Sequence, residues 1–288
     1  MSETYAAQLE RISGAVTIET AGYARVAGRG GGVTEIAVAN ERGPFLGLAE
    51  TLYGTHYNAP RAPAAPSDAD PEVFLAALRA ANGVGHRVVN GMLAQREITT
   101  SPYGHYAVLG RPVHDAWTGR QVRFYWNVAA EGGPVLLREL SSRFEYGRVP
   151  FQAKVPVVPS GYDRVDAGVL YLSDEDVAVA AHVVASAYAA LGGAIRPDVP
   201  LFTLRLAPGL GFAESPPTGD SFGMHRCDLI AEGLVRAFER GATSPKERAA
   251  VVRERLTEYG LDVERLAFNP AACYPYRFGA LGALGAAA

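Results

Sequence analysis

Positively charged side chains interrupt several stretches of this sequence that are otherwise apolar. Residues 149–172 read VPFQAKVPVVPSGYDRVDAGVLYL, and Lys154 and Arg164 stand there among residues typical of buried strands. Arg205 interrupts FTLRLA in the same way. A single cation on a strand commonly extends to solvent or pairs with a carboxylate, and for each position alone that explanation is the more frequent one. Several such residues on neighbouring strands indicate instead a site for an anion.

The segment QVRFYWNV adds more polar side chains to this pattern. Because side chains alternate along a strand, Arg123, Tyr125 and Asn127 are expected on one face, away from the apolar residues between them. Arg226 follows the start of a predicted helix near Ser221, where unpaired N–H groups favour an anion.

A phosphate ester is the anion that these residue types fit best. Arginine binds phosphate oxygens in a bidentate manner, whereas lysine acts as a point charge. Apolar surroundings and a nearby arginine lower the pKa of a lysine, and a bound phosphate opposes that shift. A lysine that loses its proton near neutral pH is a usable general base. The residues therefore predict a phosphate site in which Lys154 is the candidate base.

The composition argues against several classes of protein. The 288 residues carry a net charge of −3, which disfavours nonspecific nucleic-acid binding. The two cysteines, Cys227 and Cys273, lack partners at metal-ligand spacing, so we expect no disulfide framework and no structural zinc site. No secretory signal or membrane-spanning segment is expected, which favours a cytoplasmic protein. GRGGGV and GLGFAE do not complete a nucleotide-binding motif, and the first is expected to form a turn between strands.

The pattern of elements predicts an α+β fold with a mixed, largely antiparallel sheet flanked by helices. Residues 1–84 are expected to form a helical N-terminal segment with a Pro/Ala-rich linker at 58–71. Residues 85–278 would form the catalytic domain, and 279–288 a flexible tail. Helices are predicted over 71–83, 133–147, 173–193, 221–241 and 244–260, and strands mainly over 86–130, 149–172 and 200–209.

Five blocks of sequence resemble the HopA-type effector-like family. They fall in order between about residues 48 and 235 and read LAETLYGTHY, FYWNV, VPFQAKV…YDRVDAGVLYL, FTLRLAPGLGFAE and SFGMHRCDLIAEGL. Members of that family occur as type III effectors. In actinobacteria they occur as the lyase component of class V lanthipeptide synthetases and thioamitide pathways. The Ala/Gly/Arg-rich composition, without a Ser-rich leader, favours the biosynthetic branch.

The wider resemblance is to bacterial phosphothreonine lyases, which need no metal or organic cofactor. Those enzymes use a lysine to remove the Cα proton, a histidine to assist the departure of phosphate, and arginines to hold the phosphate. The resemblance implies that Lys154 is the base, that Arg164 and Arg205 bind phosphate, and that Arg226 is the last phosphate arginine. It also implies a phosphorylated precursor peptide as substrate and a separate Ser/Thr kinase as partner, with no role for nucleic acid or a membrane.

The main departure from those lyases is the general acid. Arg123 and Tyr125 stand where the lyases have a lysine and the acidic histidine. A tyrosine with an ordinary pKa near 10 is a weaker acid than imidazolium. The proton donor is therefore either Tyr125 or His225, and Tyr171 and Asn127 are auxiliary candidates. Three alternatives remain, namely a non-catalytic phosphopeptide-binding scaffold for the kinase, a type III effector-like protein and a phosphatase-like hydrolase.

Overall fold

The chain divides into two compact units, each formed from separate parts of the sequence. The computed structural model describes residues 3–60, 69–84, 87–89, 92–94, 96–100, 104–110, 120–270, 276–279 and 281. The first unit comprises Met1–Ala62, Pro200–Leu204 and Ala213–Ala272. The second unit comprises Pro63–Val199, Arg205–Phe212 and Cys273–Ala288.

The first unit combines helices with a small sheet. A three-stranded antiparallel meander follows the first helix, and two long helices come from the C-terminal half of the chain. Helix α6 packs on α2 and α7, and α1 packs on α7. The elements are α1 (Tyr5–Ala15), β1 (Val16–Thr20), β2 (Tyr23–Ala27), β3 (Val33–Ala37), α2 (Leu46–Leu52), the π-helical turn η1 (Tyr53–Tyr57), α6 (Phe222–Glu239) and α7 (Pro245–Glu258).

The second unit is built on a seven-stranded sheet with the order β11-β12-β8-β10-β9-β7-β6. Its strands are β6 (Glu97–Thr100), β7 (His105–Leu109), β8 (Gln121–Trp126), β9 (Gln152–Pro156), β10 (Gly168–Ser173), β11 (Leu204–Ala207) and β12 (Leu210–Glu214). A separate hairpin pairs β4 (Arg87–Val89) with β5 (Met92–Ala94). The helical elements are α3 (Pro71–Ala80), α4 (Gly132–Gly147), η2 (Pro159–Tyr162), η3 (Asp174–Asp176), α5 (Val177–Leu191) and η4 (Gly192–Ala194).

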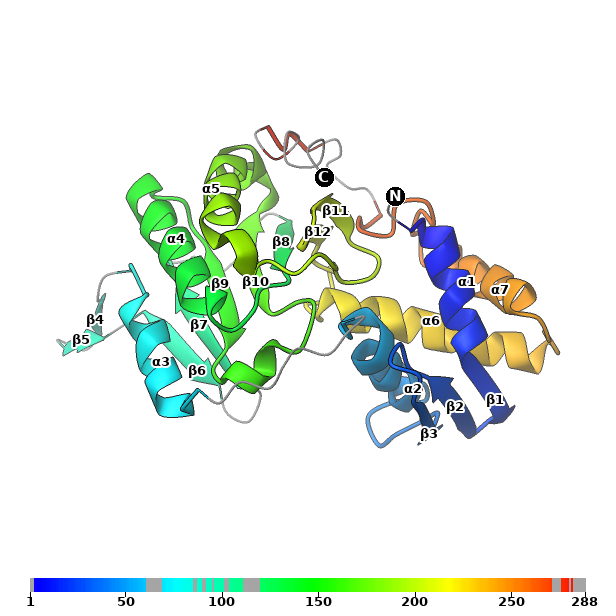
Figure 1. Ribbon diagram of the computed structural model, residues 1–288. Coiled ribbons are helices and arrows are strands. Elements are labelled where there is room, and N and C mark those ends of the chain that lie inside the picture. The colour runs from blue at the N-terminus through cyan, green and yellow to red at the C-terminus, as the bar shows by residue number, and fades with distance from the viewer. Residues whose placement is uncertain are drawn as a thin grey trace. The chain divides into compact units, whose positions relative to one another are not determined.

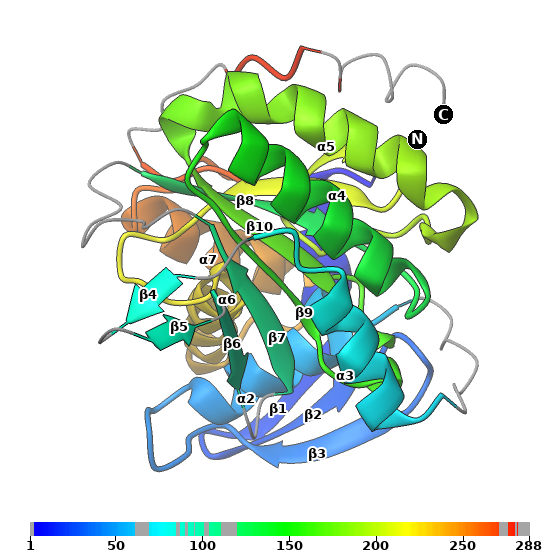
Figure 2. The same cartoon turned by 90° about the vertical axis from the view of Figure 1, so that its left-hand side faces the viewer.

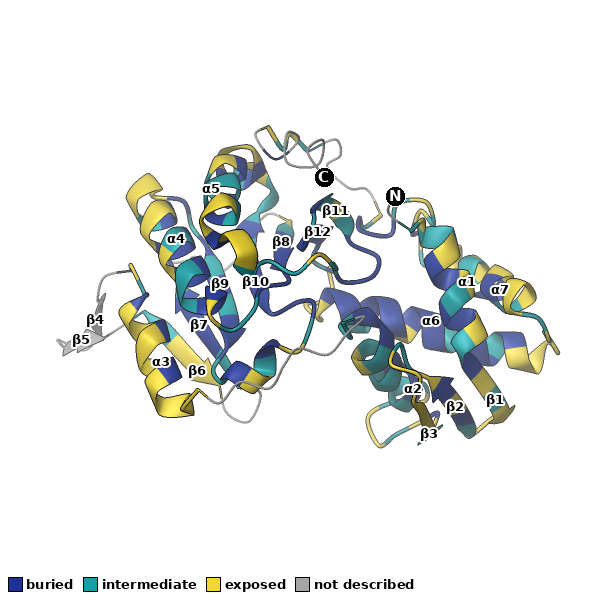
Figure 3. Ribbon diagram, viewed as in Figure 1, coloured by how far each residue is buried: buried dark blue, intermediate teal, exposed yellow. Residues whose placement is uncertain are grey.

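Helices α4 and α5 cover one face of this sheet (Figures 1 and 2). Strands β8 and β9 each pair antiparallel with β10 between them, so they run parallel to each other and α4 is the crossover helix that connects them. A Cβ on Gly168 of β10 would lie 2.4 Å from Leu136 of α4, which shows how closely helix and sheet approach. Figure 3 shows both helices buried on one side and exposed on the other. The opposite face of the sheet is therefore the one available for polar side chains.

Three helices begin at capping residues that are evident in the sequence. Asp70 caps α3 by accepting from the N–H groups of Glu72 and Val73, with Pro71 in the first turn. Ser221 caps α6, and Ser244 forms a capping box with Glu247 at α7. GRGGGV forms the predicted turn, which joins β2 to β3, and GLGFAE lies mostly in β12.

The predicted fold class is confirmed, and the N-terminal segment holds the expected helices. The structure adds the unpredicted β1–β3 sheet and divides the chain differently. Helix α3 belongs to the second unit, and α6 and α7, expected within residues 85–278, belong to the first. Sequence order does not reveal which apolar faces pack together. Parts of the predicted linker and of the predicted tail lie outside the described residues.

Among the described residues, one helical segment, Asp174–Ala194, is long and apolar enough to span a membrane by length and composition alone. It contains α5, whose apolar side packs in the core of the second unit through Ala180, Val184 and Ala187. Within this segment, 33% of the apolar window is buried.

Candidate functional site

The strand register brings four of the predicted residues to one face of the large sheet. Val169 of β10 pairs with Lys154 of β9 on one side and with Tyr125 of β8 on the other. Tyr171, two residues further along β10, pairs with Arg123 of β8. Directly opposed residues point to the same face of a sheet, so these side chains share one surface. The alternation predicted along this strand holds for Arg123 and Tyr125, because Phe124 and Trp126 take the opposite face, which α4 covers.

The ring of Tyr171 lies between the two cations. The Arg123 guanidinium carbon is 5.2 Å from the ring centroid, and the Lys154 Nζ is 5.5 Å from it. Both distances are typical of cation–π contacts. The aromatic ring thus attracts each positive charge and holds the two long side chains near the same point on the sheet. We call Lys154, Arg123, Tyr125 and Tyr171 the Lys154 cluster.

The side chains of the Lys154 cluster differ in their exposure to solvent. Lys154 and Tyr171 are half-exposed, whereas Arg123 is 6% and Tyr125 3% exposed. Lys154 is accessible, contrary to the fully apolar surroundings expected from its neighbours in sequence, because the apolar Ala153 and Val155 point to the opposite face. The chain contains one other lysine, Lys246, which is exposed at the start of α7.

Arg164 is not on a strand, in contrast to the prediction. It lies in the loop between η2 and β10, where it forms a bidentate ion pair with Asp166. The two Arg164–Asp166 contacts measure 2.5 and 2.9 Å, and Asp166 is buried. The guanidinium of Arg164 thus binds an oxyanion, the carboxylate of Asp166, through two hydrogen bonds. A phosphate would have to replace a carboxylate that the loop itself supplies.

Arg205 lies away from the Lys154 cluster. It is exposed on the edge strand β11, and three strands separate β11 from β9. At about 4.8 Å per strand this corresponds to about 19 Å of sheet from β9 and about 10 Å from β8, the strand of Arg123 and Tyr125. Burial raises the pKa of Tyr188 on α5, and the nearby charge of Arg205 partly opposes that shift, which places Arg205 near the helix-covered face. We therefore remove Arg205 from the phosphate-binding set, since linear sequence cannot reveal strand order.

Arg226 and His225 lie in α6 of the first unit and have structural roles there. Arg226 is fully buried and donates to the carbonyl oxygens of Leu266 and Phe268 and to Asn269 Oδ1. Its guanidinium also bonds to His225 Nδ1 at 2.7 Å. Burial and the charge of Arg226 lower the pKa of His225 to about 4, so the ring is neutral near pH 7. A neutral, hydrogen-bonded ring is a poor proton donor, which leaves Tyr125 as the candidate acid.

Asn127 follows β8 and fixes the loop beside it. Its Nδ2 donates to the Asp198 carbonyl at 3.1 Å, and its backbone bonds to Gly209 and Arg196. These bonds place Asn127 in a structural role, although its Oδ1 is buried without a hydrogen bond to a described residue. No group of three or more His, Cys, Asp or Glu residues suited to a metal ion occurs within the described part of the chain.

The comparisons with known proteins agree with this fold. The model of the HopA1 effector protein family matches residues 101–268, which is more than half of the chain. The chain belongs to the HopA1 effector protein family. Two solved effector proteins share the fold, and each match covers 77% of this chain and 88% of the other. The protein from Pseudomonas syringae pv. tomato strain DC3000 is 22% identical with a TM-score of 0.52, and that from Pseudomonas syringae pv. syringae strain 61 is 17% identical with a TM-score of 0.53. No curated protein matches.

Two members of the site in this HopA1-family chain were missed from sequence. Gln152 pairs with Tyr171 and so shares the face of Lys154, as the i, i+2 spacing could have indicated. Asp166 engages Arg164, and the Arg-x-Asp spacing in DRVD was the available signal. Gln152 adds an amide that can both donate and accept hydrogen bonds at the half-exposed side of the cluster.

Proposed function

We propose that this HopA1-family protein is a phosphoserine/phosphothreonine lyase that eliminates phosphate from a phosphorylated peptide. The observation that carries the proposal is the placement of Lys154 and Arg123 on one sheet face, on either side of Tyr171, with Tyr125 beside them. A base, an arginine cation and a hydroxyl donor on one surface are the groups that this reaction requires.

The sheet geometry places the proposed base and the proposed acid on two sides of one point. Lys154 and Tyr125 flank Val169 on opposite sides, so about 10 Å separates their backbones at about 4.8 Å per strand. Their side chains can therefore approach a residue lying over Val169 from two directions. This arrangement suits β-elimination, because the base must reach the proton on Cα while the acid reaches the phosphate oxygen on Cβ.

In the proposed step the Lys154 amine takes the Cα proton. The electron pair of that C–H bond forms the Cα=Cβ double bond, and the Cβ–O bond breaks with its electrons going to phosphate. Tyr125 donates a proton to the departing oxygen, and Arg123 neutralises its growing charge. The products are dehydroalanine or dehydrobutyrine and inorganic phosphate. Fixed charges directed at developing charge supply most of the rate enhancement in such sites.

Arg164 is the second phosphate ligand in this proposal. Its bidentate contact with Asp166 keeps the guanidinium extended in the absence of substrate. The dianionic phosphate carries more charge than the carboxylate of Asp166 and would compete with it for the guanidinium of Arg164. The substrate would be a precursor peptide phosphorylated by a separate Ser/Thr kinase in the cytoplasm.

The test is to incubate the purified protein with a phosphothreonine peptide in EDTA and to weigh the product. Elimination gives a peptide one water lighter than the peptide that was never phosphorylated. A product equal in mass to that peptide means hydrolysis and contradicts the lyase proposal. An unchanged phosphopeptide that nevertheless binds to the protein, also when the partner kinase is added, would favour a phosphopeptide-binding scaffold instead.

A further inference from the structure

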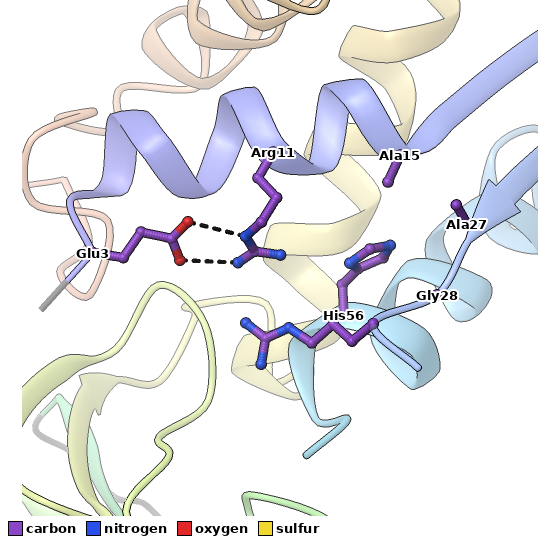
Figure 4. Close-up of a pocket in the computed structure, with 7 residues that line it drawn as sticks. Glu3, Arg11, Ala15, Ala27, Gly28 and His56 are labelled. Carbon is purple, nitrogen blue, oxygen red and sulfur yellow. Dashed lines mark hydrogen bonds and ion pairs between the residues drawn. The ribbon is translucent and has the colours of Figure 1, made fainter. Parts of the chain in front are cut away.

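A pocket of about 560 Å³ lies within the first unit, and no residue of the proposed lyase site lines it. It is lined by Glu3, Arg11 and Ala15 of the N-terminal segment, by residues 27–29 and by His56 (Figure 4). We call it the His56 pocket. Its volume falls in the range that holds a ligand of several residues or a drug-sized molecule, and greatly exceeds that of one carboxylate.

His56 is the buried polar group of this pocket. The π-helical turn η1 carries it toward α1 and the end of β2, and π-turns recur at functional sites. The residue is 3% exposed, and neither ring nitrogen makes a hydrogen bond of ordinary geometry to a described residue, although the Ala27 backbone lies close enough to affect the ring. Buried polar atoms are nearly always satisfied, so the His56 ring can gain a hydrogen bond from a ligand that enters the pocket.

The two arginines of the pocket make it electropositive. Burial lowers the pKa of His56 to about 4, and the charges of Arg11 and Arg29 act in the same direction, whereas the Ala27 backbone opposes the shift. His56 is therefore neutral near pH 7 and offers one donor and one acceptor. With Glu3 counted, the pocket carries one net positive charge.

Glu3 shows which group the pocket accepts. Its two carboxylate oxygens take bonds from Arg11 Nε and Nη2 at 2.9 and 3.0 Å (Figure 4). This ion pair is partly exposed, and exposed ion pairs contribute little stability. An external carboxylate can thus replace Glu3 at small cost, provided it gains contacts that Glu3 does not make.

We propose that the His56 pocket binds an acidic peptide segment, with one carboxylate replacing Glu3 on Arg11 and a second carboxylate or the peptide backbone engaging Arg29 and His56. The volume of the pocket accommodates neighbouring residues of the peptide, and the remaining positive charge attracts the acidic side chains. This site is independent of the lyase reaction, because binding to it requires no phosphate and no residue of the Lys154 cluster.

The test titrates the full-length protein with an acetylated, amidated Gly-Glu-Gly-Glu-Gly peptide and with its glutamine counterpart. Binding is followed by calorimetry and by the ring signals of histidines labelled for NMR. We expect the acidic peptide to shift the His56 signal while the signal of His225, buried elsewhere in the same unit, stays in place. The glutamine peptide should leave both signals unchanged.

Three variants sharpen the result. Arg11→Gln and Arg29→Gln should each weaken binding by about tenfold or more, the usual loss for a charged hydrogen-bonding partner. Glu3→Gln should strengthen it, because the internal competitor is removed. The matched control is Arg25→Gln, an exposed arginine of β2 that pairs with Glu19 and Glu35 and does not line the pocket.

Some outcomes overturn the proposal. Equal affinity in the Arg11, Arg29 and Arg25 variants would show that binding lies elsewhere. A clear preference for a phosphoserine peptide over the glutamate peptide, lost in Arg11→Gln, would overturn the assignment to carboxylates. Since these assays measure binding without turnover, failure here leaves the lyase proposal to its own test.

Discussion

Replacement of Lys154 is the sharpest test of the proposed chemistry, because the chain offers matched controls for charge and for position. Lys154→Met removes the amine, and Lys154→Arg keeps the positive charge and the contact with Tyr171 but cannot act as a base near neutral pH. Lys246→Met removes the only other lysine, which lies exposed on α7. Together the three variants distinguish the effect of losing the base from the effect of losing the positive charge and from the effect of losing any lysine.

The expected loss of activity follows from the role of the base. A positioned general base contributes about 10²–10⁴-fold in rate, or about 3–5 kcal/mol in the barrier. Lys154→Met and Lys154→Arg should both lose the rate by this factor, and Lys246→Met should retain it. Binding of a phosphopeptide should weaken more in Lys154→Met than in Lys154→Arg, since arginine preserves the attraction for phosphate.

The stability cost should be small, so lost activity cannot be attributed to unfolding. Lys154 is half-exposed, and its recorded contact is the one with the Tyr171 ring. A cation–π contact at such a site is worth about 0.5–1 kcal/mol, which corresponds to a fall in Tm of at most a few degrees. The assay is the rate of dehydrated product by mass spectrometry, with thermal unfolding in parallel. If Lys154→Arg kept more than a tenth of the rate, Lys154 would not be the base.

Four further predictions concern residues outside the Lys154 cluster. Arg205→Gln should leave the elimination rate within about twofold, since Arg205 lies near Tyr188 on the helix-covered face and about 10 Å of sheet separates its strand from β8. A large loss of rate would contradict this placement. Arg226→Gln should lower the free energy of unfolding by about 3–5 kcal/mol in urea titrations, because it leaves buried carbonyl groups unpaired. Gly223→Ala should cost about 1–3 kcal/mol because its Cβ would lie 2.3 Å from the Tyr57 ring, whereas the control Gly54→Ala meets no atom within 4 Å and should cost little. The pKa of His225 is about 4 in the folded protein and 6.5 for an unperturbed histidine, so its stabilising contribution is present above pH 6.5 and is lost as the pH falls toward 4. His225→Gln should therefore reduce the change in the free energy of unfolding over this pH range by at most about 3 kcal/mol. An unchanged pH dependence in this variant would contradict the low pKa.

Local features of this fold were predictable from sequence because they depend on neighbouring residues. The caps at Asp70, Ser221 and Ser244 set helix starts through their own hydrogen bonds. The alternation over 121–128 likewise fixed which side chains share a face. The β1–β3 sheet was missed because its β3 strand is mostly exposed and lacks the apolar alternation of a core strand.

Which cations converge could not be predicted, because that depends on strand order and on competing partners. Lys154 and Arg123 meet at Tyr171 only because β10 lies between β9 and β8, an order that differs from the order along the chain. Arg205 has a sequence context like that of Lys154, yet it lies on the edge strand. Arg226 looked available near a helix start, but main-chain carbonyl groups more than 35 residues later in the sequence take its hydrogen bonds.

The contacts of each cation therefore say more about function than its sequence context does. Arg226 is fully buried and donates to main-chain carbonyls. Breaking these hydrogen bonds would therefore cost more free energy than binding a phosphate would recover. Arg164 pairs with a carboxylate, and Arg123 and Lys154 contact an aromatic ring, whose attraction for a cation is weak beside that of a phosphate dianion. In the proposed reaction, the surface around Tyr171 would receive the phosphate and release it once the bond to the peptide has broken.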